Sequence, residues 1–143
     1  MMTVKIKNRS NNPSPAYQTP GSAGMDIYAN VDECTLHPGH WDAIPTGIFL
    51  EIPEGYECQV RPRSGLAFKN GITVLNSPGT IDSDFRGEVK VILINHGNIP
   101  FVIQQGDRIA QLVFNKVETA IFELSDELSS SERGAGGFGS TGK

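Results

Sequence analysis

The sequence lacks features that would point to several other classes of protein. It has no apolar run near the roughly 18 residues of a transmembrane helix, so we expect no membrane partner. Its N-terminus lacks the apolar core of a secretion signal. It has only two cysteines, Cys34 and Cys58, so we expect buried thiols rather than a disulfide, and a cytoplasmic location. His37 and His40 have no third ligand beside them, which argues against structural zinc.

Basic residues are also scarce. The chain has 12 lysines and arginines against 16 aspartates and glutamates, which gives a formal net charge of -4 at pH 7. This charge disfavours stable binding to nucleic acid. An acidic protein can still bind a small phosphate compound, but only where arginine, hydroxyl and glycine backbone groups gather into a local anion site.

Glycine and proline, by contrast, are frequent, with 16 and 9 of 143 residues, and they divide the chain into short runs. Residues 56–61 alternate between apolar and polar, as a half-buried strand does. Residues 89–94, 101–103 and 109–114 are apolar runs of strand length. Only residues 65–70 favour a helix. The length fits one domain, and the pattern predicts an all-β fold, a barrel or a jelly-roll-like sandwich.

The end of the chain has a different composition. We place one domain at residues 1–122 and a polar connector with a flexible, glycine-rich arm at 123–143. Residues 134–139 satisfy the G-x-G-x-x-G pattern and 137–143 the G-x-x-x-x-G-K pattern, but no strand precedes them and no helix follows. Dinucleotide-binding and P-loop folds are therefore not predicted. Arg133, the hydroxyls and the glycine N–H groups could instead bind an anion.

A second cluster is Arg61-Pro62-Arg63-Ser64-Gly65, where a predicted strand ends and the short helix begins. Two guanidinium groups, a hydroxyl and exposed backbone N–H groups suit a phosphate. The alternative is an exposed basic turn in which Ser64 caps the helix. Composition alone does not separate these two interpretations.

A third cluster lies in residues 77–88, which resemble a hairpin. Asp82 and Asp84 would share one strand face if the segment were extended. An aspartate beside a phosphate could deprotonate a water for in-line attack, while Asn76 could recognise one edge of a base. The alternative is that both aspartates merely cap turns.

Five segments together resemble the motifs of the trimeric dUTP diphosphatase (dUTPase) family, in the same order and at similar spacing. They are residues 23–27, 62–67, 79–87, 106–111 and 133–142. The resemblance implies a distorted jelly-roll barrel that assembles as a homotrimer with active sites shared between subunits. It also implies hydrolysis of dUTP to dUMP and pyrophosphate by water attack on the α-phosphorus, with Mg²⁺ held mainly by the triphosphate and water. Such an activity limits uracil in DNA and supplies dUMP for thymidylate synthesis.

By the same resemblance, Asp82 matches the family's water-activating carboxylate and Asp26 a residue that organises the site. The phosphates would be held by Arg63, Ser64, Gly65 and Gln111. The nucleoside pocket would be formed by Asn76, Thr80, Ile81 and the backbone near Lys90, too narrow for the methyl group of thymine.

The resemblance also gives roles to the arm and to one atypical residue. Arg133, Ser140 and Thr141 would close over the phosphates while Phe138 stacks on uracil. Phe85 stands where the family usually has tyrosine, whose ring packs under deoxyribose and blocks a 2′-hydroxyl. The phenyl ring can supply the same steric barrier, so we expect sugar discrimination to be kept.

Two alternatives remain at this point. One is an enzyme similar to the dCTP deaminases, which share the barrel. The other is a nucleotide-binding regulatory barrel without turnover. The segment around Asp82 and the arginine-bearing arm favour phosphate chemistry over deamination of a base.

Overall fold

The computed structural model describes all 143 residues and consists mainly of β-strands. The strands are β1 (Lys5–Asn8), β2 (Met25–Tyr28), β3 (Glu33–Leu36), β4 (Trp41–Glu51), β5 (Tyr56–Arg61), β6 (Ile72–Val74), β7 (Gly79–Ile81), β8 (Glu88–Asn95), β9 (Phe101–Gln104) and β10 (Arg108–Lys116). One helix, α1 (Ser64–Asn70), follows β5. The all-β fold is confirmed, and the four strands and the helix predicted from local patterns are all present.

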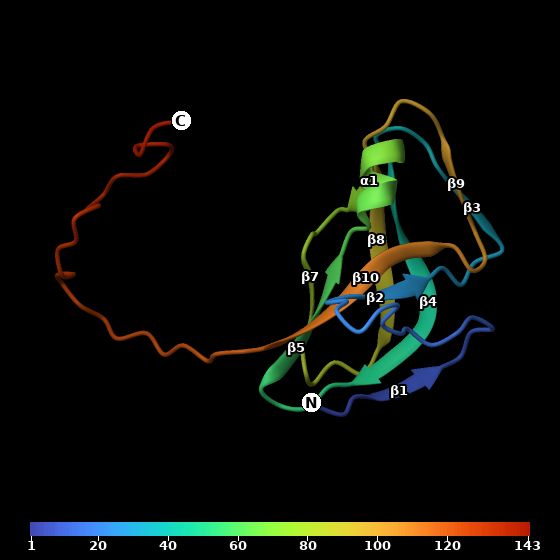
Figure 1. Cartoon of the computed structure of the whole chain (residues 1–143), viewed down its shortest axis with the longest axis horizontal. Helices are drawn as coiled ribbons and strands as arrows, with labels where there is room; N and C mark the ends of the chain where they lie inside the picture. Colours follow the sequence, from blue (N-terminus) through green and yellow to red (C-terminus); the bar gives the residue numbers. More distant parts are fainter.

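The strands form two four-stranded sheets and a short ribbon (Figure 1). The first sheet has the order β1-β4-β8-β6, the second the order β2-β10-β5-β7, and the ribbon pairs β3 with β9. Every pairing between neighbouring strands is antiparallel. The arrangement fits the expected jelly-roll-like fold, in which sheets bury their apolar faces against each other.

The core is built from alternate residues of these strands. On β8, Val89, Val91 and Leu93 are buried while Lys90 is exposed, as the period-two geometry of a strand requires. Both cysteines are free, as predicted. Cys58 is fully buried, and burial raises the pKa of its thiol to about 12. Cys34 is only partly buried.

β4 is the longest strand, although it contains residues that usually interrupt strands. Its register against β8 shifts between Pro45 and Phe49, which marks a bulge. Gly47 lies in this bulge at φ +71°, in the left-handed region that glycine tolerates best. The Thr46 hydroxyl donates a hydrogen bond to the buried carbonyl of Val89 and so ties the bulge to β8.

The segment after β7 corrects one expectation. β7 pairs with β5 in the second sheet, whereas β8 pairs with β4 and β6 in the first. Residues 77–88 are therefore not a two-stranded hairpin, and we call residues 82–87 the sheet-crossing turn. Asp82 and Asp84 do not share a strand face, because the chain turns there and the Phe85 N–H donates to the carbonyl of Asp82 at 3.2 Å.

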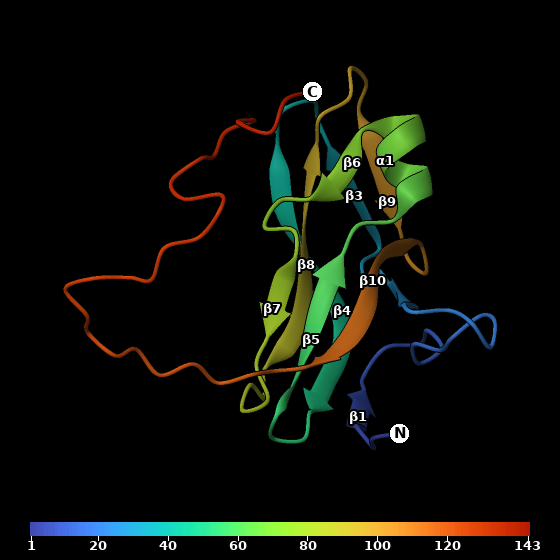
Figure 2. The same cartoon turned by 60° about the vertical axis from the view of Figure 1, so that its left-hand side comes forward.

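The chain leaves the barrel after β10 (Figures 1 and 2). The last hydrogen bond to the barrel runs from the Val117 N–H to the carbonyl of Gly55 at 2.9 Å. Beyond it, hydrogen bonds join only residues within residues 118–143. The structure thus ends its last strand shortly before the predicted domain boundary at residue 122, which remains a prediction. No helix is long and apolar enough to cross a membrane.

Candidate active site

A pocket of about 390 Å³ lies beside the sheet-crossing turn. Its lining comes from both sheets: Ala43 of β4, Val60 of β5, residues of β7 and residues of β8. Six of the predicted site residues line it: Asn76, Thr80, Ile81, Asp82, Phe85 and Lys90. The structure therefore brings the predicted base-recognition and water-activation residues together.

The walls of this pocket are apolar and its rim is polar. Val60, Ile81 and Val89 are buried, whereas Asp82 and Lys90 are exposed. No side chain or backbone N–H donates a hydrogen bond to the Asp82 carboxylate, so both its oxygens are open to a ligand. A flat ring would thus meet apolar surface inside and a carboxylate at the rim.

Two glycines shape the approach to the pocket. A Cβ atom on Gly79 would lie 3.2 Å from Cβ of Val60 and 3.4 Å from Nδ2 of Asn76, closer than most real contacts. A Cβ atom on Gly87 would lie 2.6 Å from Cζ of Phe85. Glycine at 87 therefore allows the Phe85 ring to fold back over the turn.

A second cluster forms around the buried carboxylate of Asp26 on β2, which is 5% exposed. Its oxygens lie 3.2 Å from Nε of Arg63 and 3.2 Å from Nη1 of Arg108. Gln111 on β10 donates from Nε2 to Asp26 at 3.3 Å. Two guanidinium groups offset the cost of burying the carboxylate, and the carboxylate in turn orients Arg63 and Gln111. Gly24 leaves room for Gln111, because a Cβ atom there would lie 3.2 Å from its Oε1.

The start of α1 tests whether Ser64 caps this helix. The N-cap of the helix is Arg63, and no side chain caps it by a hydrogen bond. The interpretation that Ser64 caps the helix is therefore wrong. Ser64 and Gly65 are exposed in the first turn, next to the Asp26 cluster through Arg63.

Residues of the arm form a third, separate group. Phe138 is fully exposed, and Arg133 donates from Nε to the carbonyl of Gly136 at 2.8 Å. Ser140 and Thr141 are exposed as well. A single protomer does not bring this group, the Asp26 cluster and the pocket into one site: no residue of the first two lines the pocket.

Two charged residues were missed by the sequence analysis. Glu88 lines the pocket together with Lys90. Because residues two apart on a strand point to the same face, the predicted role of Lys90 could have indicated Glu88 as well. Arg108 shares Asp26 with Arg63. Its position in the segment 106–111 pointed to the site, but its pairing with Asp26 could not be read from local sequence.

Comparison with known proteins agrees with this geometry. The dUTPase family model matches residues 10–142. The chain belongs to the dUTPase family. A deoxyuridine 5′-triphosphate nucleotidohydrolase of Cytophaga hutchinsonii is 61% identical over 142 residues, covering 99% of this chain and 92% of that protein.

Solved structures of dUTPases are similar in fold. The dUTPase of Staphylococcus bacteriophage 80alpha with dUpNHpp has a TM-score of 0.89 and 27% identity, with 100% of each chain covered. A mutant dUTPase of phage phi11 of S. aureus, described with a structural Mg(II) ion, has a TM-score of 0.77 and 22% identity, covering 88% of this chain and 98% of that one. At this lower identity the second likeness concerns the fold alone.

The side chains of this dUTPase that could act as metal ligands indicate how it would bind a metal ion. No three histidine, cysteine, aspartate or glutamate side chains lie close enough to hold one. Asp26 is already shared by two arginines, and Asp82 is a single exposed carboxylate. These residues fit a metal ion that arrives with a triphosphate and keeps its water ligands better than one held in a protein cage.

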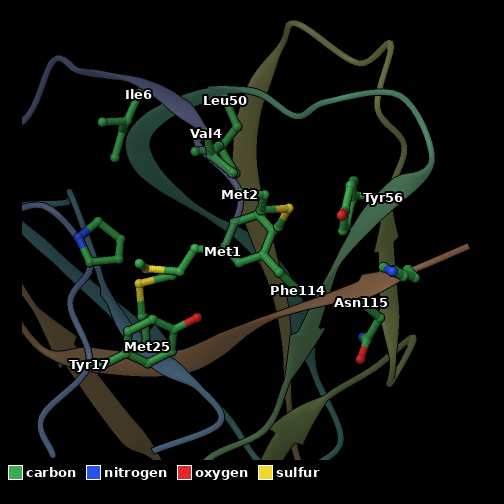
Figure 3. A pocket seen from close by; sticks show the side chains of 12 residues that line it. Met1, Met2, Val4, Ile6, Tyr17, Met25, Leu50, Tyr56, Phe114 and Asn115 are labelled. Atoms are coloured by element: carbon green, nitrogen blue, oxygen red, sulfur yellow. The ribbon is translucent and has the colours of Figure 1, made fainter. Parts of the chain in front are cut away.

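A second hollow of this dUTPase, about 610 Å³, lies elsewhere. Figure 3 shows Met1, Met2 and Met25 gathered between Tyr17 and Phe114. Nine of its twelve lining residues are hydrophobic, and none is a predicted site residue. Nδ2 of Asn115, at its edge, is buried without a hydrogen-bond partner. Because most of its lining is apolar, the hollow suits contact with another apolar surface.

Proposed function

We propose that this dUTPase hydrolyses dUTP to dUMP and pyrophosphate by attack of water on the α-phosphorus. The observation that carries the proposal is the pocket in which Asn76, Asp82 and Phe85 meet. A base-recognising amide, a free carboxylate and a ring that can lie against a sugar are the three groups that a deoxynucleotide hydrolase needs in one place. The 61% identical relative carries the name of this activity.

In this proposal Asp82 is the general base. Its carboxylate accepts no hydrogen bond in the structure, so it can take a proton from a water held between it and the α-phosphorus. Uracil lies between Asn76 and the backbone near Lys90, in contact with Thr80 and Ile81. The walls of the pocket would clash with the extra methyl group of thymine and so exclude that base.

The phosphates are bound by Arg63, Ser64, Gly65 and Gln111. Asp26 holds Arg63 and Gln111 through contacts of 3.2 and 3.3 Å. Orienting these donors before substrate arrives reduces the entropy lost on binding and keeps the chain of phosphates in line for attack. Asp26 thereby acts through its neighbours rather than on the substrate.

Magnesium is proposed to enter as the complex with dUTP. When bound there, the ion neutralises charge on the phosphate oxygens and on the leaving pyrophosphate. In the present chain Asp26 is shared by two arginines and Asp82 is a single exposed carboxylate, which suits an ion coordinated by triphosphate and water.

The arm is proposed to close the site. Arg133, Ser140 and Thr141 would bind the phosphates, and Phe138 would stack on the base. An exposed arginine and an exposed aromatic ring in a glycine-rich segment can move to a ligand at little steric cost. Closure would exclude bulk water from the reacting phosphorus.

We further propose that the enzyme is a homotrimer with shared sites, in the cytoplasm. The support is that one protomer leaves the pocket, the Asp26 cluster and the arm as three separate groups. Exposed apolar surface also supports a homotrimer. It includes the methionine-lined hollow and the almost fully exposed side chains of Ile121, Phe122 and Leu124. Surfaces of this kind usually mark contacts between proteins.

The test is turnover of dUTP, dCTP, dTTP and UTP in water enriched in ¹⁸O. We expect pyrophosphate to form much faster from dUTP than from the other three nucleotides, with the label in dUMP, because water attacks the α-phosphorus. Label in pyrophosphate would contradict attack at that atom. Ammonia from dCTP would favour the deaminase alternative, and binding of dUTP without any product would favour the regulatory barrel.

A further inference from the structure

The sheet-crossing turn, which carries Asp82 and Phe85, is closed by the side chain of Arg86. Nη1 of Arg86 donates to the carbonyl of Ser83 at 2.6 Å and to the carbonyl of Phe85 at 3.1 Å. The only other hydrogen bond within residues 82–87 is the one from the Phe85 N–H to Asp82. Because one charged nitrogen donates to both carbonyls, it holds them in a fixed arrangement.

Glu51 holds this guanidinium from outside the turn. Its Oε1 lies 3.9 Å from Nη2 of Arg86, and its Oε2 lies 2.7 Å from Nζ of Lys5. Glu51 is the last residue of β4 and is directly opposite Lys5 on β1. The hydrogen bond from Lys5 lowers the pKa of Glu51, so its carboxylate stays charged. The chain Lys5–Glu51–Arg86 thus joins the N-terminal strand to the turn.

This network contributes orientation more than stability. The side chains of Lys5, Glu51 and Arg86 are 80%, 45% and 53% exposed, and exposed ion pairs add little to the free energy of unfolding. Neither Glu51 nor Arg86 lines the nucleotide pocket. Within one chain, their contact with the site residues runs through the backbone of the turn.

The two site residues depend on that backbone in different ways. Asp82 begins the turn, at the end of β7, and its carboxylate must reach a water on the α-phosphorus. The ring of Phe85 lies over Gly87, where even a Cβ atom would approach within 2.6 Å. A change in the turn would therefore displace the general base and the ring against the sugar together.

We propose that Arg86, oriented by Glu51, is a positioning residue that fixes Asp82 and Phe85 at the nucleotide pocket. The inference rests on the proposed function, since it assigns to the turn the residues that activate water and discriminate the sugar. It adds a network of side chains outside the pocket, which extends to β1 and β4 and controls both water activation and sugar discrimination.

The test compares Arg86→Lys and Glu51→Gln with the parent and with Lys7→Gln. Lysine keeps the charge of Arg86 but has a single side-chain nitrogen, so it cannot donate to the two carbonyls from one nitrogen while a second one faces Glu51. Glutamine keeps the shape of Glu51 but not its charge. Lys7 is a matched control: it lies two residues from Lys5 on β1, and its Nζ lies 5.7 Å from the centroid of the Phe49 ring, with no bond to Glu51 or the turn.

We expect Arg86→Lys to lower kcat on dUTP by on the order of 10-fold, because small misplacements of reacting groups slow catalysis steeply. The ratio of kcat/KM for dUTP over UTP should fall in the same variant, since Phe85 moves with Asp82. Glu51→Gln should show both effects more weakly. Lys7→Gln should keep the parental values, and all variants should keep their melting temperature within a few degrees.

Parental kcat and parental dUTP-over-UTP ratio in both Arg86→Lys and Glu51→Gln would overturn the inference. So would a lowered melting temperature with parental kinetics in the folded protein, which would make the network merely structural. Equal losses of kcat and of the dUTP-over-UTP ratio in Lys7→Gln would also overturn it, because they would indicate a general effect of surface charge. Failure of the parent itself to hydrolyse dUTP would instead overturn the proposed function.

Discussion

Asp82 lies at the rim of the nucleotide pocket with a carboxylate that accepts no hydrogen bond, and Asp84 lies two residues further along the same turn. Asp82→Asn keeps the shape of the side chain but removes the base. We expect kcat on dUTP to fall by ~10²–10⁴-fold, the usual contribution of a positioned general base. Binding of dUTP, measured by calorimetry, should be kept.

Asp84→Asn is the control for Asp82→Asn. Asp84 is exposed and does not line the pocket, so its substitution changes the charge of the turn equally without touching the proposed base. It should keep turnover near the parental value. Near-parental turnover in Asp82→Asn, or equal losses in both variants, would remove Asp82 from the role.

Phe85 is the residue expected to separate dUTP from UTP. Phe85→Ala opens space beside C2′ of the sugar, so the ratio of kcat/KM for dUTP over UTP should fall. Phe85→Tyr keeps the ring and should be nearly neutral, because the barrier is steric. Steady-state kinetics on both nucleotides measure the ratio, and an unchanged ratio in Phe85→Ala would contradict the assignment.

At the scale of elements, the sequence predicted those whose signal is local. β5 has its apolar residues at strand spacing, and β8 and β10 are apolar runs with few interruptions, such as Lys90 in β8, so each could be found from its own residues. β4 could not, because Pro45 and Gly47 normally argue against a strand and only the bulge against β8 accommodates them. β1 was also missed: three of its four residues are exposed, and it lies at the edge of its sheet.

The difference between local and non-local sequence signals also applies to the candidate active site. The pocket residues from Asn76 to Lys90 come from one short stretch of sequence, so their motif could predict that they lie together. The salt bridge between Asp26 and Arg108 joins residues far apart in the chain, and nothing in either segment alone indicates the partner. The pairing of β7 and β8 with different sheets is likewise non-local, which is why the expected hairpin was wrong.

The arm is an element without tertiary hydrogen bonds to its own barrel, so its role can be tested by removal. Deleting residues 133–143 should leave the melting temperature of the unliganded protein nearly unchanged, because the segment buries little apolar surface. Turnover of dUTP should be largely lost, because the charge of Arg133 and the stacking of Phe138 are lost together.

Phe138→Ala provides the matched comparison for that deletion. It should retain more activity than the deletion, since Arg133, Ser140 and Thr141 remain, while it loses stacking worth ~1–3 kcal/mol. Melting, oligomeric mass and turnover should be measured on the same samples. Full turnover by a folded, truncated protein would show that the arm is an ordinary frayed end.

At the scale of the whole molecule, the proposed active site needs several copies of the chain. The pocket, the Asp26 cluster and the arm do not meet within one protomer, so the proposed chemistry needs residues from neighbours. Sedimentation of the parent should give a trimer at assay concentrations. A fully active monomer would contradict shared sites, whatever the roles of the individual residues.

The most direct test of the shared site mixes two defective chains. Asp82→Asn protomers keep the arm, and protomers lacking residues 133–143 keep Asp82, so each alone should form nearly inactive trimers. Co-expressed with different tags and purified as mixed trimers, they should recover about a third of parental turnover, because one of the three sites in each mixed trimer combines Asp82 of one copy with the arm of another. If turnover by the mixed trimers stays at the level of the separate variants, the arm acts on its own protomer and the shared site is contradicted.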